Sequence, residues 1–173
     1  SLAIKLYNQS KKVIIYVFET ENTSYAFQYY YNQCVHLGID IKVIDDDIAE
    51  NLRYELSDVE VVVDAIFGFG LNKAIRGIYA RVIDEINLLF EQDIISVDIP
   101  SGLDCNSGIP KGAVICATMT ISLSALKNSF LNLDTRLYTG KLIIDFLDVV
   151  DVSEEVGLFE LYEKKHAIMH LKK

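Results

Sequence analysis

Short apolar runs alternate with segments of helical periodicity along most of this 173-residue chain. Residues 13–18 are a continuous apolar run, which is typical of a buried strand. Apolar residues then recur at helical spacing from Ala26 to Cys34, and Gly38 ends this pattern, so a helix follows the strand. The same alternation predicts helices over 45–56 and 78–89 and strands over 39–44, 59–67, 94–97, 119–123 and 142–146.

Strands that alternate with helices imply right-handed crossovers and a parallel sheet covered on both faces. The β-branched run 59–67 suits a strand buried on both faces. The predicted fold class is therefore α/β, a three-layer α/β/α, Rossmann-like, doubly wound and mostly parallel sheet.

The chain is long enough for one domain, and 51% hydrophobic residues can fill its core. We expect this domain over residues 1–150. The charged segment 151–173 is a C-terminal tail, a terminal helix or a connector to something else. Residues 1–6 resemble the middle of an amphipathic helix, so we expect further residues upstream.

Net charge and apolar patterning limit the partners. The net charge of −9 opposes binding to nucleic acid or to anionic lipid. No apolar run reaches the roughly 18 residues needed to cross a membrane, so we expect a soluble, cytoplasmic protein without a membrane partner. Three cysteines without paired spacing fit reduced thiols and give no reason for a metal or redox role: Cys34, Cys105 and Cys116.

The most informative chemistry lies where the apolar run 94–97 ends. Asp98 follows it directly, and Pro100, Ser101 and Gly102 then predict a sharp turn. Ligands of parallel sheets bind outside the carboxyl ends of the strands, so Asp98 is the first candidate for catalysis. The alternative is that Asp98 only fixes the turn by accepting bonds from backbone amides.

A second carboxylate, Asp64, reaches the same sheet edge, and Gly68 and Gly70 follow it. A glycine pair after a strand can simply permit a tight turn, but beside two acids a ligand-binding loop is the better interpretation. The segment 18–25 has no glycine, and its Glu19 would repel a pyrophosphate. An ordinary NAD-dependent oxidoreductase is therefore disfavoured.

These motifs resemble the YjeF N-terminal domain, the NAD(P)H-hydrate epimerase family. The residues that carry the resemblance are the runs 64–71 and 98–104 with Arg76, Gly77, Ser107, Gly108, Gly112, Ala117 and Thr120. The resemblance implies an isomerase of nicotinamide nucleotide repair, which interconverts the C6 epimers of hydrated NADH and NADPH. The hydrated dinucleotide is then a substrate, not a cofactor, and Asp98 would act first as acid and then as base.

The resemblance also implies residue roles. The family position of Asp98 contacts the hydrated nicotinamide, and those of Asp64 and Ser101 help to hold a potassium ion, to which Thr23 could add an oxygen. Lys73 and Lys127 are possible electrostatic helpers, although surface lysines are the simpler expectation. The implied substrate-binding residues are Asn22, Thr23, Gly68, Phe69, Gly70, Leu71, Asn72, Lys73, Ala74 and Asp98.

The chain departs from the family after its first strand. A glycine-rich run is replaced there by residues 21–27, of which only Asn22 matches cleanly. The alternative function is therefore a catalytically impaired domain that serves as a nucleotide-binding or dimerisation module. The expected partners are a small-molecule dinucleotide, a second copy in a homodimer and a fused dehydratase domain.

Overall fold

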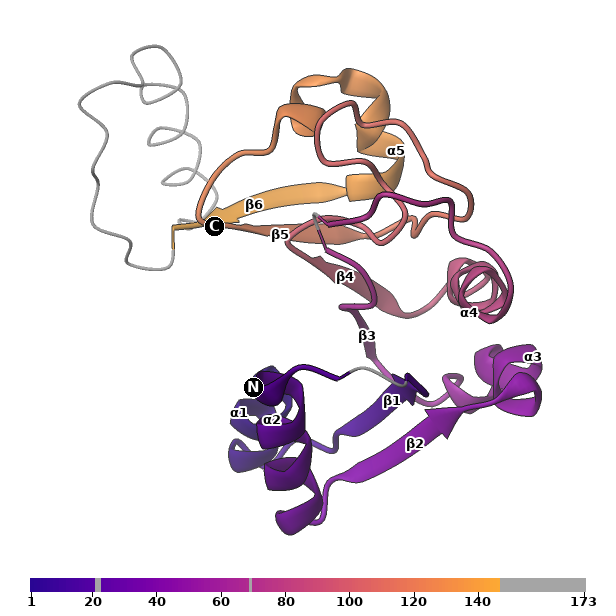
Figure 1. The fold of residues 1–173 in the computed structure, drawn as a ribbon, viewed down its shortest axis with the longest axis vertical. Coiled ribbons are helices and arrows are strands. Elements are labelled where there is room, and N and C mark those ends of the chain that lie inside the picture. Colours follow the sequence, from indigo (N-terminus) through magenta and orange to yellow (C-terminus); the bar gives the residue numbers. More distant parts are fainter. Residues whose placement is uncertain (21–22, 69, 147–173) are drawn as a thin grey trace. The chain divides into compact units, whose positions relative to one another are not determined.

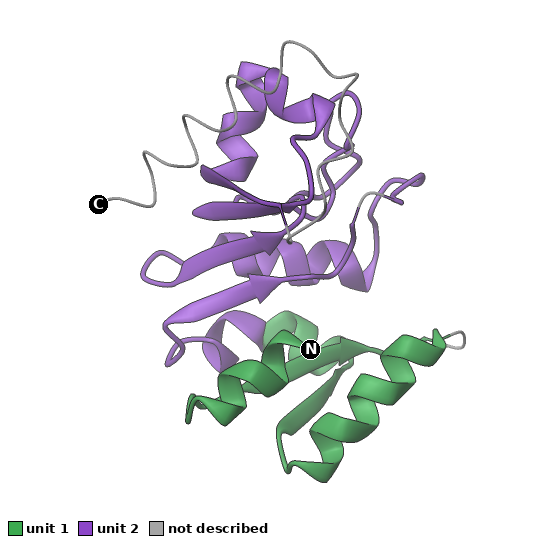
Figure 2. Ribbon diagram, turned by 90° about the vertical axis from the view of Figure 1, so that its left-hand side faces the viewer, with its two compact units in different colours: residues 1–51 green, residues 52–173 purple. Residues whose placement is uncertain are grey.

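A computed structural model describes residues 1–20, 23–68 and 70–146. The chain forms two compact units, residues 1–51 and residues 52–173 (Figure 2). The predicted boundary at residue 150 lies outside the described residues, as does the predicted tail. Each unit has its own parallel sheet, so the fold is described unit by unit.

Unit 1 is built on two parallel strands, β1 (Ile14–Phe18) and β2 (Asp40–Ile44). The helices of this part of the chain are α1 (Leu2–Asn8), α2 (Tyr25–His36) and α3 (Asp46–Glu55), and α3 continues into unit 2. The side chain of Ser24 caps α2, because its Oγ accepts a bond of 3.1 Å from the amide of Phe27. Cys34 is the buried residue of α2.

Unit 2 holds four parallel strands in the order β3-β4-β5-β6 (Figure 1). They are β3 (Val61–Asp64), β4 (Asp93–Val97), β5 (Met119–Leu123) and β6 (Lys141–Asp145). The helix α4 (Ile78–Asn87) connects β3 to β4 and buries one apolar face, Val82, Ile83 and Ile86. Three short elements precede β6: η1 (Asn128–Leu131), η2 (Leu133–Thr135) and α5 (Arg136–Thr139).

The predicted α/β class with parallel strands is confirmed, since all six described strands pair in parallel. The strand predicted over 59–67 is shorter and ends at Asp64. Its expected burial on both faces is wrong, because Val61 and Val63 are 46% and 40% exposed. In unit 2 the carboxyl ends of four neighbouring strands meet at one edge, which is where the candidate residues lie.

Candidate functional site

Asp64, the last residue of β3, is a buried carboxylate with protein donors on both oxygens. Its Oδ2 accepts bonds from the hydroxyl of Ser96 (2.7 Å) and the amide of Ser101 (2.9 Å). Its Oδ1 accepts bonds from the hydroxyl of Ser101 (2.5 Å) and the amide of Ile66 (3.3 Å). Only 1% of Asp64 is exposed, so these bonds replace water around the charge. One side chain therefore fixes the turns after both β3 and β4.

Ser101 extends this network to the loop that follows β3. The amide of Phe67 donates a bond of 2.8 Å to Ser101 Oγ. Ser101 itself is 1% exposed, so its hydroxyl is a buried junction between two loops. The network sets the direction in which the chain leaves Phe67 toward the predicted nucleotide loop.

Asp98 lies directly after β4 and takes a left-handed backbone conformation, with φ of 70°. Its amide donates to the carbonyl of Ile121 (2.7 Å), and its Oδ1 accepts from the amide of Leu123 (3.1 Å). The amide that reaches the carboxylate thus belongs to the neighbouring strand β5, and not to the turn at Pro100. A non-glycine residue held at positive φ beside a sheet edge is a feature that clusters at functional sites.

Lys127 contacts this carboxylate. Its Nζ lies 2.7 Å from Asp98 Oδ1 and donates a bond of 3.0 Å to the carbonyl of Leu123. The side chains of Lys127 and Asp98 are 20% and 15% exposed. The expectation of a solvated surface lysine is wrong for Lys127, whereas Lys73 is exposed as expected.

An open pocket of about 540 Å³ lies within unit 2, along the loop between β3 and α4. Phe67 and Tyr79 supply aromatic lining, with ring centroids 5.1 Å apart. Phe69 lies outside the described residues. The pocket is lined by six of the predicted substrate-binding residues: Gly68, Gly70, Leu71, Asn72, Lys73 and Ala74.

The glycines of this loop leave the pocket open. A β-carbon added to Gly68 or Gly70 would meet no atom within 4 Å, and neither residue has a left-handed φ. A tight turn therefore does not require glycine at either position. The missing side chains instead provide space in which a ligand can approach the backbone.

Lys111 supports the pocket wall from the segment after the Ser101 turn. Its Nζ donates a bond of 2.9 Å to the carbonyl of Leu71 and forms an ion pair with Asp104. The bond from Lys111, followed by bonds from Ser107, holds the pKa of Asp104 well below its usual range. Ile75 bridges to Gly112, which attaches the pocket loop a second time.

Two predicted site residues come from the segment after β1. Asn22 lies outside the described residues. Thr23 belongs to unit 1, whereas Asp98, Asp64 and the pocket loop belong to unit 2. In unit 1, Thr23 Oγ1 accepts a bond of 2.8 Å from the side-chain amide of Gln28.

The resemblance implies a potassium ion at Asp64 and Ser101, and here both oxygens of Asp64 have protein donors. Each oxygen of this carboxylate already accepts two hydrogen bonds, so an ion would have to displace a protein donor. In the described ranges, no three His, Cys, Asp or Glu residues gather as a metal site. Asp64 and Ser101 therefore have a positioning role in this geometry, whether or not an ion binds nearby.

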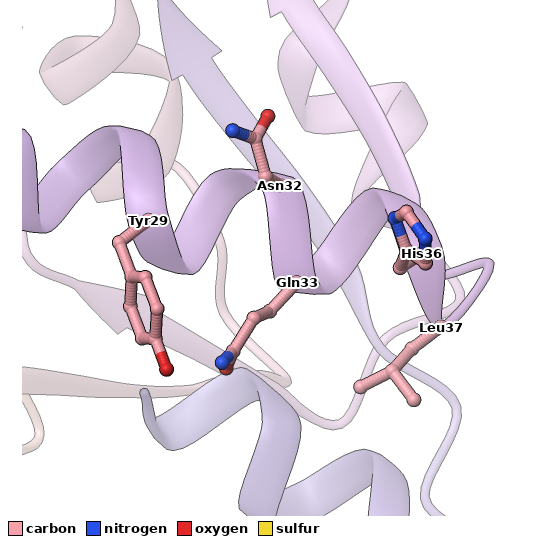
Figure 3. Close-up of a pocket in the computed structure, with 5 residues that line it drawn as sticks. All are labelled: Tyr29, Asn32, Gln33, His36 and Leu37. Carbon is pink, nitrogen blue, oxygen red and sulfur yellow. The ribbon is translucent and has the colours of Figure 1, made fainter.

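A second concave surface, about 420 Å³, lies along α2 in unit 1. Tyr29 and Gln33 extend from one side of this helix (Figure 3). The other lining residues are Asn32, His36 and Leu37, so none of the predicted site residues lies here. This surface therefore shares no residue with the candidate site.

Two further observations concern membrane spans and disulfides. Within the described part of the chain, no helix has the length and apolar character of a membrane span. Among the described residues, no disulfide joins Cys34, Cys105 or Cys116.

The parallel fold, the two carboxylates at one sheet edge and the open pocket define a protein of the doubly wound α/β class, a class whose ligands bind at this edge of the sheet. Within this class, the chain belongs to the family described as YjeF-related protein N-terminus, whose model matches residues 1–129. The predicted resemblance is thereby confirmed.

Several known proteins are similar to this chain. The bifunctional NAD(P)H-hydrate repair enzyme Nnr of Thermofilum pendens is 40% identical over 130 residues, which are 75% of this chain and 24% of that protein. The NAD(P)H-hydrate epimerase of Limosilactobacillus fermentum is 32% identical over 89 residues, 51% of this chain and 42% of that protein. The chain thus spans less than half the length of either relative.

A solved structure supports the fold assignment. The crystal structure of yeast ynu0 (YNL200c) superimposes with a TM-score of 0.65 and 19% identity. The superposition covers 83% of this chain and 57% of the yeast chain. At this identity the likeness concerns the fold alone.

Proposed function

We propose that this chain is an NAD(P)H-hydrate epimerase domain, an isomerase that acts on hydrated NADH or NADPH. The observation that carries the proposal is the placement of Asp98. Its carboxylate stands at the carboxyl end of β4, 15% exposed, at positive φ and paired with Lys127. Relatives named as epimerases or as repair enzymes support the choice of substrate.

Asp98 would exchange protons with the hydroxyl on C6 of the hydrated ring. Protonation of this hydroxyl lets the C6–O bond break, and water leaves as the ring-nitrogen lone pair forms a planar iminium. Water then adds to either face of C6, and the carboxylate takes up the released proton. The step needs no oxidant or reductant, and such acid–base catalysis is worth roughly 10² to 10⁴ in rate.

The pocket of unit 2 would hold part of the dinucleotide. Its aromatic lining from Phe67 and Tyr79 offers apolar contacts, while Asn72 and Lys73 offer polar ones. Lys73 would attract a phosphate, and the open sides of Gly68 and Gly70 would admit the ligand to the backbone.

The test is direct epimerisation of hydrated NADH and NADPH by the purified chain, compared with Asp98→Asn. We expect Asp98→Asn to lose at least 100-fold in rate, on the order given for acid–base catalysis, with an unchanged circular dichroism spectrum. A near wild-type rate in this variant would remove Asp98 from the mechanism. Binding of the dinucleotide without turnover by the wild type would favour the alternative of a catalytically impaired module.

The remaining parts of the proposal concern the whole protein. We propose a cytoplasmic homodimer, a domain over residues 1–150 and a connector over 151–173. A dehydratase partner domain is supported by the bifunctional name of the Thermofilum relative. Light scattering of the purified chain tests the dimer, and cell fractionation tests the compartment.

Potassium dependence is a separate proposal. The donors to Asp64 all belong to the protein, and the proposed mechanism assigns no step to the ion. Epimerisation rates in potassium and in sodium at equal ionic strength test it, and equal rates would contradict a potassium requirement.

A further inference from the structure

Two neighbouring strands of unit 2 end in the same unusual backbone conformation. Asp98 follows β4 with φ of 70°, and Ser124 follows β5 with φ of 66°. Residues other than glycine rarely adopt such φ angles, so the surroundings must hold each of these two residues in place. These two strands are adjacent and parallel, which brings both positions to one edge.

The contacts that hold this edge converge on one oxygen. The amide of Leu123 and the Nζ of Lys127 both contact Asp98 Oδ1, at 3.1 Å and 2.7 Å. Lys127 also donates to the carbonyl of Leu123 at 3.0 Å, so its ammonium group links the carboxylate of Asp98 to the backbone of Leu123. Both of these donors lie on Oδ1, so the substrate would meet the other oxygen, Oδ2.

We propose that Lys127 is a positioning residue for Asp98, and this inference rests on the proposed epimerase function. The ion pair with Lys127 holds Oδ1 next to the amide of Leu123 in β5, and this fixes the direction of Oδ2. Proton transfer requires the oxygen within about 2.6 to 3.2 Å of the hydroxyl it serves, so rotation of the carboxylate slows catalysis. Lys127 acts through Asp98, and its loss should lower kcat more than it changes KM.

A second lysine provides a matched comparison. Lys111 also pairs with an aspartate, Asp104, and donates to a carbonyl, that of Leu71. The side chains are similarly exposed, 32% and 15% for this pair against 20% and 15% for Lys127 and Asp98. Lys111 supports the pocket wall, however, so its loss should raise KM rather than lower kcat.

The experiment measures kcat and KM of the full chain and of Lys127→Met, Lys127→Arg and Lys111→Met. We expect kcat to fall roughly 10- to 100-fold in Lys127→Met, within the range for a misaligned acid–base group. Lys127→Arg should recover most of this loss, because a guanidinium can still donate to Oδ1. Lys111→Met should change mainly KM. Equal kcat in Lys127→Met and the wild type would overturn the proposal, as would an equal loss in both lysine variants.

A readout independent of activity separates this inference from the proposed function. Release of Asp98 in Lys127→Met should speed amide hydrogen exchange of Leu123 about tenfold or more relative to the wild type, while Lys127→Arg keeps the protection. If the wild type does not epimerise the substrate, the proposed function fails, and the exchange rate still decides whether Lys127 holds Asp98. Unchanged exchange at Leu123 in folded Lys127→Met would refute the positioning role.

Discussion

Gly102 and Ala113 approach so closely that a β-carbon on Gly102 would lie 2.1 Å from the carbonyl oxygen of Ala113. Gly102 also has φ of 98°, an angle that residues with a side chain rarely adopt. Gly102→Ala should therefore destabilise the fold by roughly 2 to 5 kcal/mol, from the left-handed backbone and from overpacking. Urea denaturation measures the loss. A change below 1 kcal/mol would show that the backbone of Ala113 moves aside.

Gly68 is the opposite case, since an added side chain there meets open space. Gly68→Leu should leave the unfolding free energy nearly unchanged but occupy the pocket. A clash between side chain and ligand costs roughly 1 to 3 kcal/mol, or about 5- to 150-fold in KM. Gly68→Ala serves as the smaller control, and we expect an intermediate KM. Identical KM values in all three proteins would place the ligand elsewhere.

Asp64→Asn tests the buried hydrogen-bond network around Asp64. In either orientation of the new amide, its NH₂ faces a backbone N–H, that of Ile66 or that of Ser101. We expect a loss of about 1 to 3 kcal/mol in the free energy of unfolding, the cost of an unpaired buried donor. The exposed Asp84→Asn is the control and should stay within about 0.5 kcal/mol. Equal stability of both variants would contradict the role assigned to Asp64.

The Asp104–Lys111 pair should give the protein a pH-dependent stability. Because the folded-state pKa of Asp104 is lowered from 3.8, its contribution is complete above about pH 4 and declines as the pH falls further. The difference in unfolding free energy between wild type and Asp104→Asn should thus be constant from pH 7 to about pH 4 and shrink toward pH 2. Lys111→Met should reduce the difference, since Lys111 is the largest cause of the lowered pKa. A difference that grows below pH 4 would reverse the assigned sign.

Much of the fold could be predicted because its strands are apolar runs. The run 94–97 became β4, and 119–123 became β5 with unchanged bounds. The strand predicted over 59–67 extends too far. The carboxylate of Asp64 accepts bonds from Ser96 and Ser101, and the strand ends at Asp64. The short elements η1, η2 and α5 have fewer residues than periodicity needs to be recognised.

The candidate site was predictable where its residues directly follow an apolar strand run. The acidic turn at Asp98 and the glycine loop at 68–70 were visible as motifs. Lys127 was named with Lys73 as a possible helper, but its contact with Asp98 was not predicted, because the pairing of β4 with β5 brings it there from far along the chain. Nothing in its local sequence distinguishes it from the exposed Lys73.

The shared carboxylate of Asp64 also limits how this domain can be re-engineered. Its bonds to Ile66, Ser96 and Ser101 make the loops after β3 and β4 depend on each other for their conformation. If Asp64 and the loop after it were grafted into a relative without the matching serines, the buried acid would lose its side-chain donors. Chimeras between family members should therefore exchange both segments together, as one cassette.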